Sequence, residues 1–124
     1  MQPVATLECV VLDCPDPAQL AAFYRSLLGG TINQPDPRWV VGDRWATLHT
    51  PAGQVLAFQF VDGYVPPRWP DPAHPQQFHL DFHVDALEQA HASVLALGAR
   101  LLESAHGWRV YADPAGHPFC LVGK

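Results

Sequence analysis

The sequence is poor in charge, and positive charge is especially scarce. Of its 124 residues, 15% are Asp, Glu, Lys or Arg and only 7 are Lys or Arg, so the formal net charge is -5. Folded domains usually carry about 25% charged residues. So few basic side chains leave no stripe that neutralises phosphates, which argues against a nucleic-acid partner. The hydrophobic share of 48% also excludes a disordered chain.

Long hydrophobic runs and paired cysteines are also missing. No apolar stretch approaches the roughly 18 residues that cross a bilayer, and the first residues lack the basic and apolar regions of a signal peptide. Cys9, Cys14 and Cys120 are an odd number with no CxxC spacing, which argues against a disulfide framework. These absences predict a reduced, cytoplasmic protein without a membrane partner.

The first half of the chain carries a strand signal, a helix signal and three further strand signals. An apolar stretch from Val4 to Leu12 predicts a buried strand. Asp16 followed by Pro17 predicts the start of a helix, and Gly29 predicts its end. Short strands are expected near residues 39–41, 44–49 and 54–61.

The same order returns in the second half. A strand is expected over 78–84, then a helix capped by Asp85 and ended by Gly98, then strands near 100–103, 108–112 and 118–122. The two capping aspartates lie 69 residues apart, as do the two glycines. This repetition predicts an α+β fold of two βαβββ modules, residues 1–62 and 77–124, joined by a proline-rich connector, 63–76, within a single domain.

Three stretches make a family resemblance specific. They are a helix ending in Phe23-Tyr24 and Leu28-Gly29, the segment HLDFHVD at 79–85, and WRVYADPAGH at 108–117. Together they resemble the vicinal oxygen chelate superfamily, which includes glyoxalases, bleomycin-resistance proteins and ring-cleaving dioxygenases. The proline-rich connector is similar to that of its glyoxalase-like domain branch. The resemblance implies an open cup, formed by the curved mixed sheets of both modules, with the helices outside.

The resemblance also implies that a divalent metal binds in the cup at four ligand positions. These positions fall on Cys9, Gln59, His79 and Cys120. The family's enzymes use a glutamate at the last position, so the carboxylate general base and the iron triad are both absent here. Thiolate and imidazole donors suit zinc, and zinc or iron are the metals to test. In the alternative interpretation the cysteines are small packing residues, and we assign no metal from the sequence.

Strand alternation identifies the polar residues expected in the cup. His79, Asp81 and His83 share one face of the predicted strand, while the apolar residues between them face the helices. Asp81 can orient the His79 imidazole, which makes these two the candidate catalytic residues. The alternative is that the polar residues form structural hydrogen bonds at the sheet rim or a dimer seam. The expected ligand-binding residues are Cys9, Trp45, Gln59, Trp69, His79, Asp81, Trp108, Tyr111 and Cys120.

Three functions are compatible with these residues. The first is binding of a small planar or aromatic metabolite or antibiotic in an aromatic-lined cup, without catalysis. The alternative is a metal-dependent lyase or isomerase of the glyoxalase type, or a ring-cleaving dioxygenase of the extradiol type. A metal-free acid–base enzyme using His79 and Asp81 is the third. The connector, stiffened by proline, carries Trp69 either as a partial lid or as a dimer contact. Low charge and this exposed aromatic connector predict a homodimer.

Overall fold

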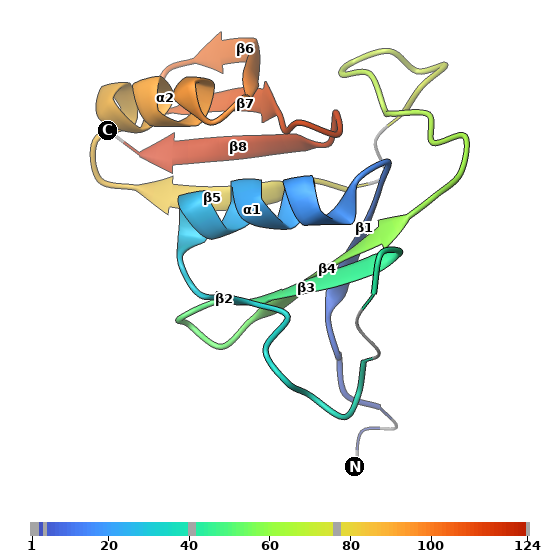
Figure 1. The fold of residues 1–124 in the computed structure, drawn as a ribbon. Helices are drawn as coiled ribbons and strands as arrows, with labels where there is room; N and C mark the ends of the chain where they lie inside the picture. Colours follow the sequence, from blue (N-terminus) through green and yellow to red (C-terminus); the bar gives the residue numbers. More distant parts are fainter. Residues whose placement is uncertain (1–2, 4, 40–41, 76–77, 124) are drawn as a thin grey trace.

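The computed structural model describes residues 3, 5–39, 42–75 and 78–123, which form two four-stranded sheets and two helices (Figure 1). The first half forms β1 (Val10–Cys14), α1 (Pro17–Leu28), β2 (Thr31–Ile32), β3 (Trp45–His49) and β4 (Val55–Phe60). The second half forms β5 (Leu80–Val84), α2 (Leu87–Ala96), β6 (Arg100–Ala105), β7 (Trp108–Ala112) and β8 (Pro118–Gly123). Each half is a βαβββ unit, which confirms the predicted α+β fold.

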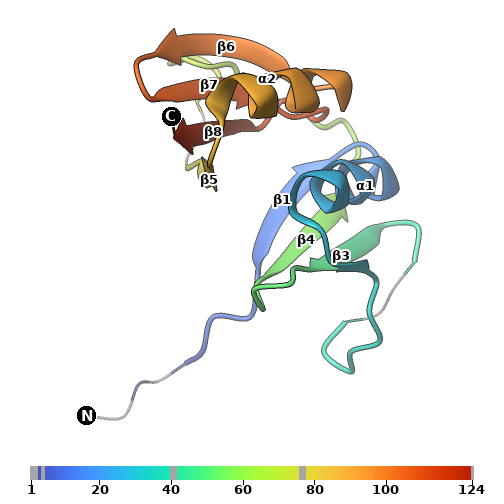
Figure 2. The ribbon, with the colours of Figure 1, turned by 90° about the vertical axis from the view of Figure 1, so that its left-hand side faces the viewer.

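The two sheets have matching topologies. Their strand orders are β1-β4-β3-β2 and β5-β8-β7-β6. In each sheet the first strand of the module runs parallel to the last, while the other neighbours are antiparallel. β1 and β5 are therefore both edge strands. Each begins later than the sequence predicts, and residues 5–9 lead away from β1 with Leu7 83% exposed (Figure 2).

The helix ends follow the predicted signals at three of four positions. The Asp16 carboxylate accepts a hydrogen bond from the Gln19 N–H at 3.1 Å, and Gly29 ends α1 with a φ of 78°. Gly98, with a φ of 108°, follows the end of α2. The predicted cap of α2 was wrong, because Ala86 occupies that position and the carboxylate of Asp85 instead lies 3.2 Å from the His83 ring. Neither described helix is long and apolar enough to cross a membrane.

One predicted strand was also misplaced. Trp39 lies outside any strand, and the rest of the expected strand, residues 40–41, lies outside the described residues. The Arg38 guanidinium stacks 4.2 Å above the Trp39 ring, so this tryptophan packs within a loop. The fourth strand of the first sheet is instead β2, which pairs with the end of β3.

Helix α1 lies between the two sheets (Figure 1). Tyr24 of α1 stacks on Phe58 of β4 with ring centroids 5.8 Å apart, and also contacts Phe82 and Phe119 of the second sheet. Since alternate residues of a strand point to opposite faces, Gln59 and Asp81 lie on the faces turned away from α1. Both sheets are therefore open, and each turns a helix-free face outward.

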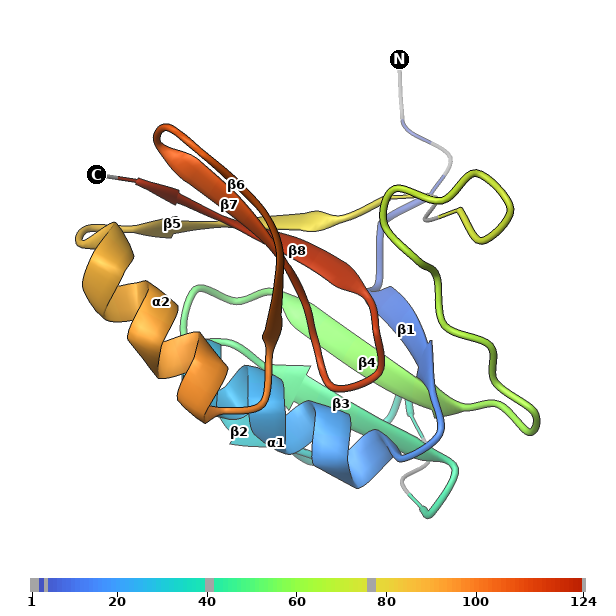
Figure 3. The same ribbon diagram turned by 90° about the horizontal axis from the view of Figure 1, so that it is seen from above.

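The connector between β4 and β5 runs along one side of the molecule (Figure 3). Its backbone is held in a compact turn, in which Arg68 N–H donates to His74 C=O at 2.7 Å and Asp71 N–H donates to Arg68 C=O at 2.7 Å. The Tyr64 hydroxyl also donates to the Ala115 carbonyl at 2.8 Å, which fastens the connector to the second module. These hydrogen bonds therefore fix the position of the connector segment that contains Trp69.

Candidate functional site

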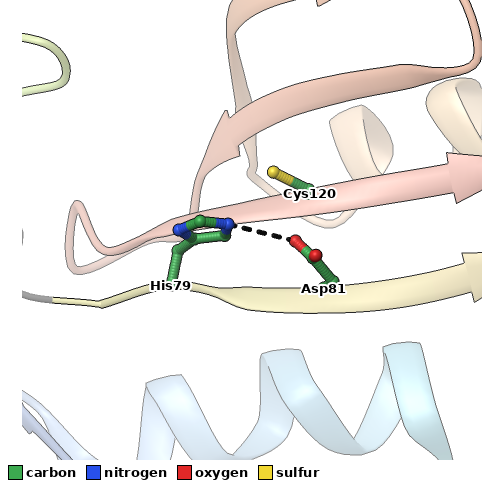
Figure 4. Close-up of side chains that lie close together, drawn as sticks. All are labelled: His79, Asp81 and Cys120. Atoms are coloured by element: carbon green, nitrogen blue, oxygen red, sulfur yellow. Dashed lines mark ion pairs between the residues drawn. The ribbon is translucent and has the colours of Figure 1, made fainter.

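The side chains of His79, Asp81 and Cys120 lie together on the helix-free face of the second sheet (Figure 4). We call these three residues the donor cluster. The His79 Nε2 atom lies 3.2 Å from Asp81 Oδ1, and the potential ligand atoms of all three residues lie within 4.8 Å of one another. Asp81 on β5 pairs directly with Cys120 on β8, so adjacent parallel strands bring the carboxylate and the thiol together.

The donor cluster is buried at one end and open at the other. The side chains of His79 and Asp81 are 37% and 61% exposed, whereas Cys120 is only 7% exposed. Burial, together with the nearby Asp81 carboxylate, raises the pKa of the Cys120 thiol to about 11. The thiol is therefore protonated at neutral pH. A metal that bound there would have to displace this proton.

The donor set fits zinc better than iron. In the described part of the chain, this is the one group of at least three His, Cys, Asp or Glu side chains with ligand atoms so close together. Imidazole, thiolate and carboxylate are all zinc ligands, and three protein ligands with one open position are typical of catalytic zinc. Non-haem iron oxygenases use two histidines and one carboxylate, whereas this group contains a single histidine.

The two remaining family positions lie in the first module. Gln59 is on β4, on the helix-free face of the first sheet beside its cross-strand neighbour Trp45. Cys9 lies just before β1 and borders a cleft of about 740 Å³ between the edge strands β1 and β5, which Asp81 also borders. Cys9 is nevertheless not part of the donor cluster, and Gln59 lies on the helix-free face of the other sheet, so within the described residues the four positions do not surround one centre.

The expected aromatic residues separate into different surroundings. The Trp69 ring lies edge-on to His79 with centroids 6.4 Å apart, so the connector forms a wall beside the donor cluster. Trp108 shares the face of Cys120 and is partly exposed. Tyr111, also expected in the cup, faces the helices instead. It is fully buried, stacks on Phe119 with centroids 5.4 Å apart, and its hydroxyl lies 2.8 Å from His91 Nδ1.

Strand alternation missed two charged residues on this face, Arg100 and Glu103. Arg100 pairs with Ala112 and Glu103 pairs with Val110, although the two residues are an odd number apart. A β-bulge between Leu101 and Glu103 adds one residue to the strand, so the side chains of Arg100 and Glu103 point to the same face of the sheet. The Glu103 carboxylate contributes to the raised pKa of Cys120. Nothing in the local sequence marks the bulge, so period-two reasoning places these residues on opposite faces.

Comparison with known families identifies the protein class. A family described as the glyoxalase-like domain matches residues 9–122, nearly the whole chain. The chain belongs to the glyoxalase-like domain family. No curated protein matches this glyoxalase-like chain significantly.

Solved structures share the fold of this glyoxalase-like protein at low sequence identity. A glyoxalase/dioxygenase from Nostoc punctiforme is 19% identical with a TM-score of 0.71, over 98% of this chain and 92% of that one. A glyoxalase/bleomycin resistance protein/dioxygenase family enzyme from Burkholderia phytofirmans PsJN is 19% identical with a TM-score of 0.69, covering 96% and 98% of the two chains. The fosfomycin resistance protein FosX from Listeria monocytogenes is 15% identical with a TM-score of 0.69, covering 98% and 93%.

Proposed function

We propose that this protein binds a small planar or aromatic metabolite or antibiotic on the helix-free face of the second sheet. The observation that carries this proposal is the position of the donor cluster beside the Trp69 wall. A few convergent polar groups next to aromatic surfaces are how small-molecule sites are usually built. His79 and Asp81 can bond polar atoms of the ligand, while Trp69 and Trp108 offer flat surfaces on the same face. Similarity to FosX, named as a fosfomycin resistance protein, supports a small-molecule ligand.

A panel of planar aromatic acids screened by ligand-observed NMR tests this proposal. We expect at least one member to bind, and its binding to be lost in Trp69→Ala and His79→Ala. Trp39→Ala is the matched control, because Trp39 packs against Arg38 in the first module. Absence of any binder, or a binder equally retained by Trp69→Ala and His79→Ala, would contradict the proposal.

We also propose that a second copy of the chain completes the cup. Cys9 and Gln59 belong to the first module, so a partner's first module would have to bring these positions to the donor cluster. Exposed apolar side chains surround the two edge strands, with Leu7 before β1, Val65 in the connector and Phe78 before β5. Such patches and unpaired strand edges favour association.

Light scattering tests the dimer. It should give twice the chain mass, and Phe78→Asp should shift the protein toward the monomer. A wild-type monomer at 0.1 mM (about the concentration of a scattering experiment) would contradict the proposal.

The second candidate function is a zinc-dependent lyase or isomerase. It is favoured by the closeness of the three ligand atoms in the donor cluster. His79, Asp81 and Cys120 would hold the metal, which when bound supplies Lewis-acid polarisation of substrate oxygens. Without a metal, Asp81 holds the His79 ring at Nε2 and orients it toward the open face, where it can bind or accept a proton from a ligand. The single histidine does not support the alternative of an iron-dependent dioxygenase.

Elemental analysis of tag-free protein, purified without chelator or nickel resin, tests the zinc site. We expect about one zinc per chain, lost in both His79→Ala and Cys120→Ala. His83→Ala is the matched control, because His83 shares the strand but pairs with Asp85 outside the donor cluster. Zinc retained by His79→Ala, or less than a tenth of an equivalent in the wild type after incubation with zinc, would exclude this function.

A further inference from the structure

We infer that the ligand of this protein carries an anionic group, and that Arg68, Trp69 and Arg100 form a separate pocket for it beside the donor cluster. This inference deepens the proposed function and depends on it for the identity of the ligand. The anion pocket itself, defined by these three residues, stands on separate observations and can be tested alone.

The anion pocket is a cavity of about 220 Å³ between the connector and the helix-free face of the second sheet. Arg68 and Trp69 come from the connector, while Arg100 comes from β6, and all three line the cavity. Its remaining lining includes Ala112, with a single methyl group, and Gly116, with no side chain, and these two residues leave space above the sheet. The volume suits a carboxylate, sulfonate, phosphonate or phosphate group with a few attached atoms, and it is too small for a nucleotide.

Neither arginine of the anion pocket has an ion-pair partner. No carboxylate of the described chain lies within 4.0 Å of the Arg68 or Arg100 guanidinium, whereas Arg38 pairs with Asp36 and Arg109 with Glu88. Asp71, three residues after Arg68, is engaged by the Ala73 N–H at 2.8 Å and by His74 at 3.3 Å. Arg25 and Arg44 also lack an ion pair in the described structure, so what distinguishes Arg68 and Arg100 is that both line one cavity, in a chain with only 7 basic residues and a net charge of -5.

Trp69 adds a neutral donor to the two charges. Its indole Nε1 is buried and has no hydrogen-bond acceptor in the described structure. A buried donor without an acceptor is costly. Because the Trp69 side chain lines the anion pocket, a small rotation of the indole would let its N–H reach a bound oxyanion. The hydrogen-bonded turn of the connector holds the backbone of this tryptophan in position.

The register of the second sheet places the anion pocket next to the donor cluster. Arg100 pairs with Ala112, whereas Cys120 pairs with Val110, two residues along the same strand. Two residues of a strand span about 7 Å. Across the sheet, Arg100 on β6 and Cys120 on β8 are also two strands apart, which adds about 10 Å. Trp69 is the lining residue that contacts the donor cluster, because its ring centroid lies 6.4 Å from that of His79. A ligand with an anionic group in the anion pocket can therefore extend past Trp69 and place polar atoms at His79. This spacing favours a small aromatic or functionalised acid over an uncharged ligand.

Titration of inorganic phosphate into chelator-treated protein by calorimetry tests the anion pocket without the unknown ligand. We expect binding that Arg100→Gln and Arg68→Gln each weaken about tenfold or more, as expected for a charged hydrogen bond. Trp69→Phe keeps an aromatic ring but removes the N–H donor, and should weaken binding about threefold to tenfold. Arg25→Gln is the matched control, because Arg25 is exposed on α1 and has no ion pair in the described structure.

Separate measurements distinguish the anion pocket from the functions proposed for the donor cluster. Cys120→Ala should abolish zinc binding and leave phosphate affinity within about twofold, because Cys120 does not line the anion pocket. Failure of phosphate to bind at 10 mM (about a hundredfold above typical protein concentrations) would exclude the anion pocket. It would also be excluded if Arg25→Gln weakened phosphate binding as much as Arg100→Gln. Both conclusions hold whether or not the donor cluster binds zinc. Arginine-dependent phosphate binding together with failure of the aromatic-acid screen would retain the anion pocket and reject the proposed function. Circular dichroism and thermal melts of every variant confirm that the fold is intact.

Discussion

The hydroxyl of Tyr24 donates a hydrogen bond to Oδ2 of Asp113 across 2.6 Å, and this contact joins the two modules. Tyr24 lies on α1 of the first module, while Asp113 opens the turn between β7 and β8 of the second. The other carboxylate oxygen of Asp113 accepts hydrogen bonds from the Ala115 and His117 N–H groups at 2.8 and 3.0 Å. Both residues are almost fully buried. One carboxylate therefore shapes the turn and fastens it to the helix.

Tyr24→Phe should lower the free energy of unfolding by about 1–3 kcal/mol, because it leaves a buried carboxylate without one of its donors. Urea unfolding measures the change. Tyr64→Phe is the control, since its hydroxyl is only partly buried and donates to a backbone carbonyl. A Tyr24→Phe loss no larger than that of Tyr64→Phe would contradict the central role of the contact.

Asp113 should make stability depend on pH. Burial raises the pKa of Asp113 above its ordinary value, so the folded protein binds this proton more tightly than the unfolded chain does. Its contribution to stability is therefore fully present below the unfolded pKa, near 3.8, and is lost as pH rises through the folded pKa. Asp113→Asn removes the titration. The stability of the wild type relative to this variant should fall as the pH rises above the unfolded pKa near 3.8, as followed by urea unfolding. A relative stability that rises over this range would contradict the assigned direction.

Cys120 should resist alkylation at neutral pH. With a pKa of about 11, only about one thiol in a thousand is ionised at pH 8, and the thiolate is the reactive form. Iodoacetamide labelling followed by peptide mass spectrometry should show a rate that rises steeply toward pH 11. Asp81→Asn should increase the rate severalfold at pH 9 (about two units below the pKa), because it removes the neighbouring negative charge. Asp85→Asn is the control, and an equal increase there would contradict the local effect of Asp81.

Gly116→Ala should displace the connector. An added Cβ would lie 2.7 Å from Cβ of Pro66, and Gly116 also has a φ of 92°. Gly53→Ala provides a matched control, because Gly53 has a φ of 95° but nothing within 4 Å of the added atom. Both variants should lose about 1–2 kcal/mol from the positive φ, and Gly116→Ala should lose about 1–3 kcal/mol more from the clash. Urea unfolding separates the two losses, and a shift in Trp69 fluorescence should accompany only Gly116→Ala. Equal losses in both variants would show that the connector does not pack tightly here.

Local patterns were enough to predict the modules of this protein. Asp16 and Gly29 bound the first helix because side-chain capping and positive φ act within a few residues. Alternation predicted that His79 and Asp81 share a face, since successive strand residues always point to opposite sides. The same reasoning failed where a contact competed with a local signal, as at Asp85, whose carboxylate pairs with His83 rather than capping α2.

Contacts between segments that are distant in the sequence determined the features that local patterns did not predict. Tyr111 faces the helices because β7 pairs with β8 in a register that stacks its ring on Phe119. The β-bulge in β6 turns Arg100 and Glu103 to the same face, and the connector turn brings Trp69 against His79. The separation of Gln59 from the donor cluster likewise follows from the packing of α1 between the sheets (Figure 1). Each of these features depends on strand register or on contacts across many residues, which short-range periodicity does not encode.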